Sequence, residues 1–153
     1  MRKVNSNKYY GVSVEYKEVN AAGMPLSKKE TYIVAAATYM EAEQKATRYA
    51  DKDEGNRKYT ITSISKVNYT EVYTNDYFPA SYFCAKVVTW PNPDTKIELD
   101  GHTGKQNRKA YYYLFESRTA ERAETMAKKL LSKNFPEWAE IIIRKAKFKA
   151  ICE

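Results

Sequence analysis

The stretch YIVAAATYMEAEQKATRYA, residues 32–50, carries the signals that decide the fold. It opens with Tyr32-Ile33-Val34, an aromatic and β-branched run that is typical of a strand. Thr38 then predicts a helix N-cap, and Glu41 three residues later completes a capping-box pattern. One narrow apolar stripe follows at helical spacing and consists of Ala42, Ala46, Tyr49 and Ala50. The stripe predicts a helix that lies close against a sheet, because its side chains are mostly small.

The same pattern returns 81 residues later as YLFESRTAERAETMAKKLL, residues 113–131. Thr38 aligns with Thr119, and both helices keep their alanine stripe. The likeness continues before this block at an offset of 73, where Tyr9-Tyr10 aligns with Tyr82-Phe83. After the block it continues at an offset of 79, where Tyr69 aligns with Phe148. The offset changes within expected loops, where insertions are tolerated best. We interpret the pattern as a tandem duplication.

Each half is expected to fold in the order strand, strand, helix, strand. The predicted fold class is α+β, with mostly antiparallel sheet or sheets and one helix packed on each repeat. The first repeat is expected over residues 1–74, the junction over 75–80 and the second repeat over 81–153. A half of this size buries too little apolar area to fold well alone. We therefore expect one shared core, built either as one extended sheet or as two halves face to face.

Three strands are expected in the first half, at Tyr10–Tyr16, Thr31–Val34 and Tyr59–Tyr73. In the second half a long hairpin loop is expected over Pro91–Gln106, and Ile141 opens the last strand. Gly23 and Pro25 supply turn chemistry between the first two strands.

Composition excludes several classes of protein. With 43% hydrophobic, 14% aromatic and 29% charged residues, the chain is not expected to be disordered. No apolar run reaches the roughly 20 residues of a membrane-spanning helix, and the first residues do not form a signal peptide. Two cysteines, Cys84 and Cys152, cannot make a disulfide framework, which favours a reducing cytoplasm.

Catalytic patterns are weak throughout the sequence. His102 is the only histidine, and it is expected at an exposed loop flanked by glycines. Phosphate-cradling glycine loops and Cys/His clusters are absent from the sequence. We therefore expect no enzymatic activity, no catalytic residue, no metal and no cofactor.

The run from Tyr32 to Glu43 resembles the centre of an uncharacterised family, a domain of unknown function. Its members are small duplicated proteins of Bacteroidetes and of their crAss-like phages. They share an aromatic opening strand like Tyr9-Tyr10 and a third strand like Tyr69–Tyr73. The second copy departs from the pattern, with Arg122 where the first has Glu41. The resemblance implies an origin in a bacteriophage or mobile element, and it implies no site residues.

Positive charge is concentrated in the second half. The net charge is +7, of which residues 1–79 carry +2 (12 basic, 10 acidic) and residues 80–153 carry +5 (14 basic, 9 acidic). Lys145, Lys147 and Lys149 alternate with apolar residues, so they are expected on one face of a single strand. Cations mixed with aromatic rings on a sheet suit single-stranded DNA or RNA, because lysines neutralise phosphates and rings stack on bases. The candidate binding residues, with Trp90 and Tyr111 as the stacking rings, are Lys86, Trp90, Lys105, Arg108, Lys109, Tyr111, Arg144, Lys145, Lys147 and Lys149.

A second reading stays open. Lysines also protect exposed strands from aggregation, and tyrosines are common in ordinary sheets. The chain would then be a protein-interaction module, such as a virion or assembly component or an inhibitor of a host defence or transcription protein. Its partner would be a phage or host protein or a second copy of the chain, with Trp90 and Tyr112 in the interface.

Overall fold

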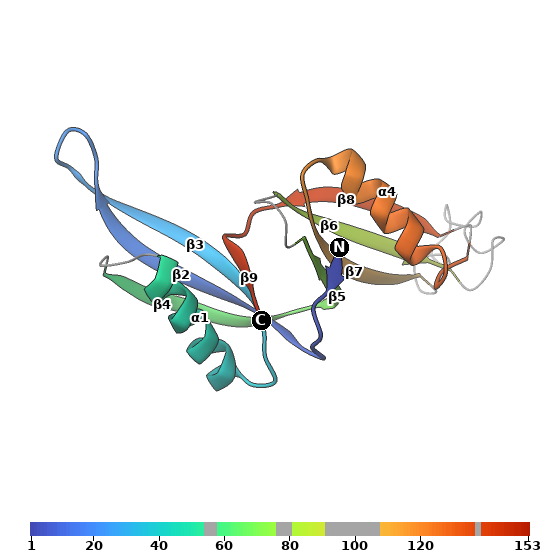
Figure 1. Cartoon of the computed structure of the whole chain (residues 1–153), viewed down its shortest axis with the longest axis horizontal. Helices are drawn as coiled ribbons and strands as arrows, with labels where there is room; N and C mark the ends of the chain where they lie inside the picture. Colours follow the sequence, from blue (N-terminus) through green and yellow to red (C-terminus); the bar gives the residue numbers. More distant parts are fainter. Residues whose placement is uncertain (54–57, 76–80, 91–107, 137–138) are drawn as a thin grey trace. The chain divides into compact units, whose positions relative to one another are not determined.

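The structure is a computed structural model that describes residues 1–53, 58–75, 81–90, 108–136 and 139–153 (Figure 1). It is an α+β fold built mostly of strands. In chain order the elements are β1 (Arg2–Lys3), β2 (Tyr9–Val19), β3 (Pro25–Ala35), α1 (Tyr39–Asp53), β4 (Tyr59–Val67), β5 (Tyr69–Thr74), β6 (Ser81–Thr89), β7 (Lys109–Ser117), α4 (Ala120–Leu131), β8 (Glu140–Ala146) and β9 (Ala150–Cys152).

The chain divides into two compact units, and both are discontinuous in sequence. Unit 1 comprises Met1–Lys3 and Tyr69–Ala146, and unit 2 comprises Val4–Asn68 and Lys147–Glu153. Unit 1 holds a five-stranded sheet in the order β1-β5-β7-β6-β8, and unit 2 holds a four-stranded sheet in the order β4-β2-β3-β9. The described strands therefore form two sheets rather than one extended sheet. The predicted boundaries at 75–80 stay a prediction, because residues 76–80 lie outside the described residues.

Unit 2 is organised by the β2–β3 hairpin. Its turn is held by Asn20, whose side-chain oxygen accepts hydrogen bonds from the backbone N–H groups of Ala22 (3.0 Å) and Met24 (2.8 Å). Gly23 adopts φ +80°, a conformation that favours glycine. The second strand begins at Pro25, earlier than the predicted Thr31, because the register continues from Tyr9↔Ala35 to Val19↔Pro25 without a break.

Helix α1 covers one face of the unit 2 sheet (Figure 1). Its predicted N-cap is confirmed, since Thr38 Oγ1 accepts a hydrogen bond from Glu41 N at 3.1 Å. The Glu41 carboxylate accepts in return from Ala37 N at 3.0 Å, one residue before the usual capping-box partner. The predicted stripe is buried at its alanines, which pack with sheet residues that include Tyr10, Val12, Val14, Tyr32 and Val34.

Unit 1 has the same local plan. Helix α4 packs on β6, β7 and β8, and Thr119 is its N-cap, accepting a hydrogen bond from Arg122 N at 3.2 Å. Arg122 has no carboxylate with which to complete a capping box. The core beneath the helix consists of Ala127 and Leu131 with sheet residues Ala85, Val87, Tyr113 and Phe115. The predictions of one helix on each sheet and of its alanine stripe therefore agree with the structure.

The third strand of each half differs from the prediction. The expected strand Tyr59–Tyr73 is two strands, β4 in unit 2 and β5 in unit 1, which are separated at Asn68. The expected last strand is likewise β8 in unit 1 and β9 in unit 2, with residues 147–149 between them. The second part of each divided strand pairs in parallel with a strand of its unit: β5 pairs with β7, and β9 pairs with β3. The sheets are therefore mixed, because these two pairings join antiparallel hairpins.

Candidate nucleic-acid interface

Two of the predicted cations, Lys86 and Arg144, lie on the same face of the unit 1 sheet, the face away from α4. Lys86 in β6 is directly opposite Tyr112 in β7, and its Nζ lies 6.0 Å from the centre of the Tyr112 ring. Arg144 in β8 is exposed and opposite Cys84, two residues from Lys86 along the same face. This cluster of Lys86, Tyr112 and Arg144, which we call the cation–ring cluster, mixes two cations with one half-buried ring.

The two predicted stacking rings are not in this cluster. Trp90 is only 5% exposed, so its ring has little free surface for a base. Tyr111 points to the α4 side of the sheet, where its ring lies 5.2 Å from that of Phe135. Both side chains thus belong to the packing of unit 1. The aromatic side chain on the face of Lys86 is the adjacent, half-buried Tyr112, because successive strand residues face opposite sides.

The lysines at 145, 147 and 149 do not share one strand face, which corrects the expectation from their alternation. Strand β8 and unit 1 both end at Ala146, so Lys145 belongs to unit 1, while Lys147 and Lys149 belong to unit 2. Lys149 is engaged there. Its Nζ lies 3.7 Å from carboxylate oxygens of both Glu30 and Asp53, and its backbone N–H donates to Thr31 O at 2.8 Å. Lys149 therefore anchors the segment that leads into β9.

The remaining predicted cations lie near the start of β7. Arg108 and Lys109 are exposed. Lys109 is on the Tyr111 side of the sheet, opposite to the side of Lys86, by the alternation of strand residues. Lys105 and His102 lie outside the described residues, and so does the whole predicted hairpin loop, residues 91–106.

Cys84 is a nucleophilic side chain beside the cation–ring cluster. Burial raises the pKa of its thiol, while a hydrogen bond with Tyr69 and the charge of Arg144 act in the opposite direction. Burial dominates, so the thiol is neutral near pH 7 and is a poor nucleophile. Among the described residues no group of three or more His, Cys, Asp or Glu side chains could hold a metal ion.

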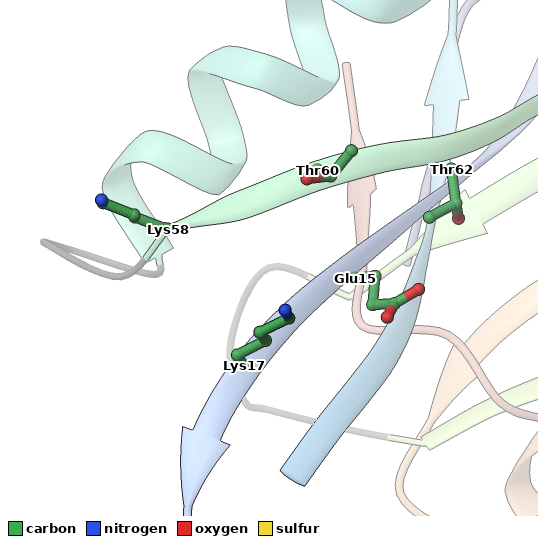
Figure 2. A pocket seen from close by; sticks show the side chains of 5 residues that line it. All are labelled: Glu15, Lys17, Lys58, Thr60 and Thr62. Carbon is green, nitrogen blue, oxygen red and sulfur yellow. The ribbon is translucent and has the colours of Figure 1, made fainter. Parts of the chain in front are cut away.

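The structure also exposes a polar groove that the sequence reasoning missed. It lies on the sheet of unit 2, has a volume of about 660 Å³, and is lined by Glu15, Lys17, Lys58, Thr60 and Thr62 (Figure 2). Glu15 and Thr60 are directly opposite each other in β2 and β4. The signal for it was present in the alternation of Glu15 and Lys17 with buried Val14 and Tyr16. That alternation predicts a polar face, but not the neighbouring strand that completes a groove.

Net positive charge is divided more evenly between the two units than between the two halves of the sequence, residues 1–79 and 80–153. Unit 1 carries 14 basic and 10 acidic residues, or +4, and unit 2 carries 12 and 9, or +3. The C-terminal segment accounts for part of the change, because it brings Lys147 and Lys149 into unit 2. Positive charge is therefore available on both units.

The fold and this cluster define a small protein of two helix-covered mixed sheets with exposed cations. Residues 8–153 match the family model described as a domain of unknown function (DUF4494), so the chain belongs to this family. No curated protein and no solved structure matches the chain. None of the helices in the described ranges is long and apolar enough to cross a membrane.

Proposed function

We propose that the protein is a non-enzymatic accessory protein that binds single-stranded nucleic acid through the cation–ring cluster on unit 1. The observation that carries the proposal is the position of Lys86 over Tyr112, with Arg144 on the same sheet face. Cations of this kind neutralise phosphates and release counterions, and a neighbouring ring stacks on a base. The net charge of +7 favours encounter with a polyanion.

The cluster suits a single strand better than a duplex. Tyr112 is half-buried on the sheet face that α4 does not cover, where an unpaired base can reach its ring. A paired base is stacked inside a duplex and cannot do so. The choice between DNA and RNA depends on contacts to the 2′-hydroxyl, so both strands belong in the test.

The test is fluorescence anisotropy with labelled 20-nucleotide dT and rU strands between 50 and 200 mM NaCl. The variant Lys86→Ala/Arg144→Ala removes two cations, so the slope of log K against log salt should fall by about 1.4, at about 0.7 for each phosphate contact. Tyr112→Leu should weaken binding by about 1–3 kcal/mol, the typical value of one stacked base.

The control variant is Lys128→Ala, because Lys128 is on α4 and pairs with Glu124 at 2.9 Å. It should leave affinity nearly unchanged. The proposal is wrong if the wild-type chain retains neither strand at 50 mM salt.

A protein-interaction module is the second candidate, and the tip of the β2–β3 hairpin favours it. Val19 and Met24 are 71% and 62% exposed. The hairpin extends past the last residue pair that β2 forms with β4, Tyr16↔Tyr59. Exposed apolar side chains at a projecting tip fit a partner's apolar surface. The partner would be a phage or host protein. In that case Val19→Thr/Met24→Ser should abolish a complex of fixed stoichiometry, as measured by size-exclusion chromatography with light scattering, and leave nucleic-acid binding intact.

We also propose that the chain arose by tandem duplication. The pairing registers support this origin. With the offsets of 73, 81 and 79, Tyr9↔Ala35 corresponds to Tyr82↔Glu116, and Tyr9↔Val67 corresponds to Tyr82↔Ala146. The parallel pair Tyr32↔Ala150 corresponds to Tyr113↔Glu71. Superposition of the two units in an experimental structure tests the origin, and units that fail to superpose would contradict it.

A bacteriophage or mobile-element origin, with action in the host cytoplasm or in the virion, is the biological setting that we propose. The resemblance of residues 32–43 to proteins of crAss-like phages supports it. Gene neighbourhood is the direct check. Replication genes nearby would favour nucleic-acid binding, and capsid genes would favour the interaction module.

A further inference from the structure

The sheet of unit 2 has a face that α1 does not cover. Hydroxyl groups and lysines line this face toward the β2–β3 turn and the start of β4. Residues directly opposite in neighbouring antiparallel strands share a face. Glu15 in β2 is opposite Lys29 in β3 on one side and Thr60 in β4 on the other. Lys17 follows two residues after Glu15 and therefore lies on the same face. The buried residues Tyr10, Val12 and Val14 alternate with this row and face α1.

Two hollows border this face. The larger is the groove of about 660 Å³ in which Lys17 and Lys58 accompany the hydroxyls of Thr60 and Thr62 (Figure 2). The smaller, of about 250 Å³, lies at the other side of the sheet and includes Lys29 and Lys147 among its lining residues. A path across the sheet from one hollow to the other therefore meets a cation on β2, on β3 and on the segments beside β4 and β9.

These four lysines are free to bind an external anion. None of Lys17, Lys29, Lys58 and Lys147 forms an ion pair with another described residue, in contrast to Lys28, Lys45 and Lys149. Among the described residues that line the groove, Glu15 is the one carboxylate. It is half-buried, and Lys17 and Lys58 outnumber it in the same groove. The face is thus cationic overall.

Resting on the proposed function, we infer that this face is a second contact surface for single-stranded nucleic acid and that it holds the phosphodiester backbone. Lys17 and Lys58 neutralise phosphates in the groove. The hydroxyls of Thr60 and Thr62 donate hydrogen bonds to phosphate oxygens, as Ser and Thr commonly do. Glu15 accepts a hydrogen bond from an exocyclic amino group, which cytosine offers and thymine lacks.

No aromatic side chain lines the groove among the described residues. Binding here is therefore electrostatic, with strong salt dependence and little contribution from stacking. The cation–ring cluster on unit 1 has the complementary chemistry, because it contains a ring. The two surfaces therefore predict separable contributions to binding.

The test is anisotropy of labelled 20-nucleotide dT and dC strands with the full chain. Lys17→Ala/Lys58→Ala should lower affinity at least five-fold at 50 mM NaCl and reduce the salt slope by about 1.4, the value for two phosphate contacts. The matched control is Arg48→Ala/Lys52→Ala, which removes the same charge from exposed positions of α1. Glu15→Gln should keep the slope and lose the preference for dC over dT. Circular dichroism confirms that each variant is folded.

The outcomes separate this inference from the proposed function. Wild-type chain that binds no strand removes both. Only the inference is overturned if Lys86→Ala/Arg144→Ala weakens binding while Lys17→Ala/Lys58→Ala weakens it no more than the α1 control does. If Lys17→Ala/Lys58→Ala weakens binding more than the α1 control, and Lys86→Ala/Arg144→Ala has no effect, the inference is supported and the unit 1 site is overturned. Full competition by millimolar inorganic phosphate, or by poly-glutamate at equal charge, would show a general anion site and would also overturn it.

Discussion

Ile151→Ala tests the parallel docking of β9, the feature by which the end of the chain completes unit 2. Ile151 is opposite Ile33 in the neighbouring strand and is only 8% exposed. The change removes three carbons, and at about 0.8 kcal/mol for each buried carbon the transfer loss is about 2 kcal/mol. A residual cavity adds to this, so we expect a loss of about 2–3 kcal/mol. The loss cannot exceed the free energy with which β9 docks, because a three-residue strand can detach instead.

The assay is urea unfolding of the full chain, combined with amide hydrogen exchange. At a slope of about 2 kcal/mol/M, the midpoint should fall by about 1 M. Protection should also weaken at Ala150–Cys152 and at the paired residues Tyr32–Val34, since local opening of β9 exposes both strands. Leu26→Ala is the control, because Leu26 is in the same strand β3 but outside the segment that pairs with β9. It is exposed, so its effect should stay within about 0.5 kcal/mol. A loss below about 0.5 kcal/mol for Ile151→Ala with unchanged protection would refute the docked strand.

Three further predictions concern the helices and the buried thiol. Leu131→Ala, at a side chain on the buried face of α4 that is 1% exposed, should destabilise the chain by about 2–5 kcal/mol in urea unfolding. A hydrogen bond from the Ala37 backbone, with help from Lys45, lowers the pKa of Glu41 below 4.5. Glu41→Gln should therefore reduce stability at pH 7, and the difference should vanish as the pH falls below 4.5. Burial raises the pKa of Cys152 from 9.0 to about 12. Iodoacetamide at pH 8 should leave this thiol unmodified by mass spectrometry, and its contribution to stability should be lost as the pH rises from 9 through 12.

Local features of the fold could be predicted from the sequence. Thr38 and Thr119 are N-caps because a hydroxyl at that position satisfies a backbone N–H within three residues. The alanine stripe of each helix is buried because helical spacing places it on one face. Gly23 marks the hairpin turn because the turn needs a positive φ, which glycine adopts easily.

The division of the third strands could not be predicted in this way. Apolar and aromatic residues recur every two or three positions through both β4 and β5, so the pattern is the same whether the segment stays in one sheet or leaves it. The choice depends on a parallel partner far along the chain, and local pattern contains no information on such pairing. Lys149 shows the consequence. It continues an alternating row of lysines in the sequence, but in the structure it pairs with Glu30 and Asp53, which come from the other half of the chain.

Prediction of the candidate site was limited in the same way, because strand pairing and facing could not be read from local pattern. Lys86 and Arg144 were found because each is a cation on an expected strand, but the ring beside Lys86 is Tyr112 rather than Tyr111. A shift of one residue moves a side chain to the other face of a sheet. The groove of Lys17 and Thr60 was missed because its walls come from strands whose pairing was not assigned.

The path of the backbone has a practical consequence for dissecting this protein. The chain passes between the units three times, at residues 3–4, 68–69 and 146–147. A cut at the predicted junction would give an N-terminal fragment that carries β5 without β7 and a C-terminal fragment that carries β9 without β3. Each fragment would expose an unpaired strand edge and should aggregate alone. Mixing the two during refolding should restore both sheets, since each fragment supplies the strand that the other lacks.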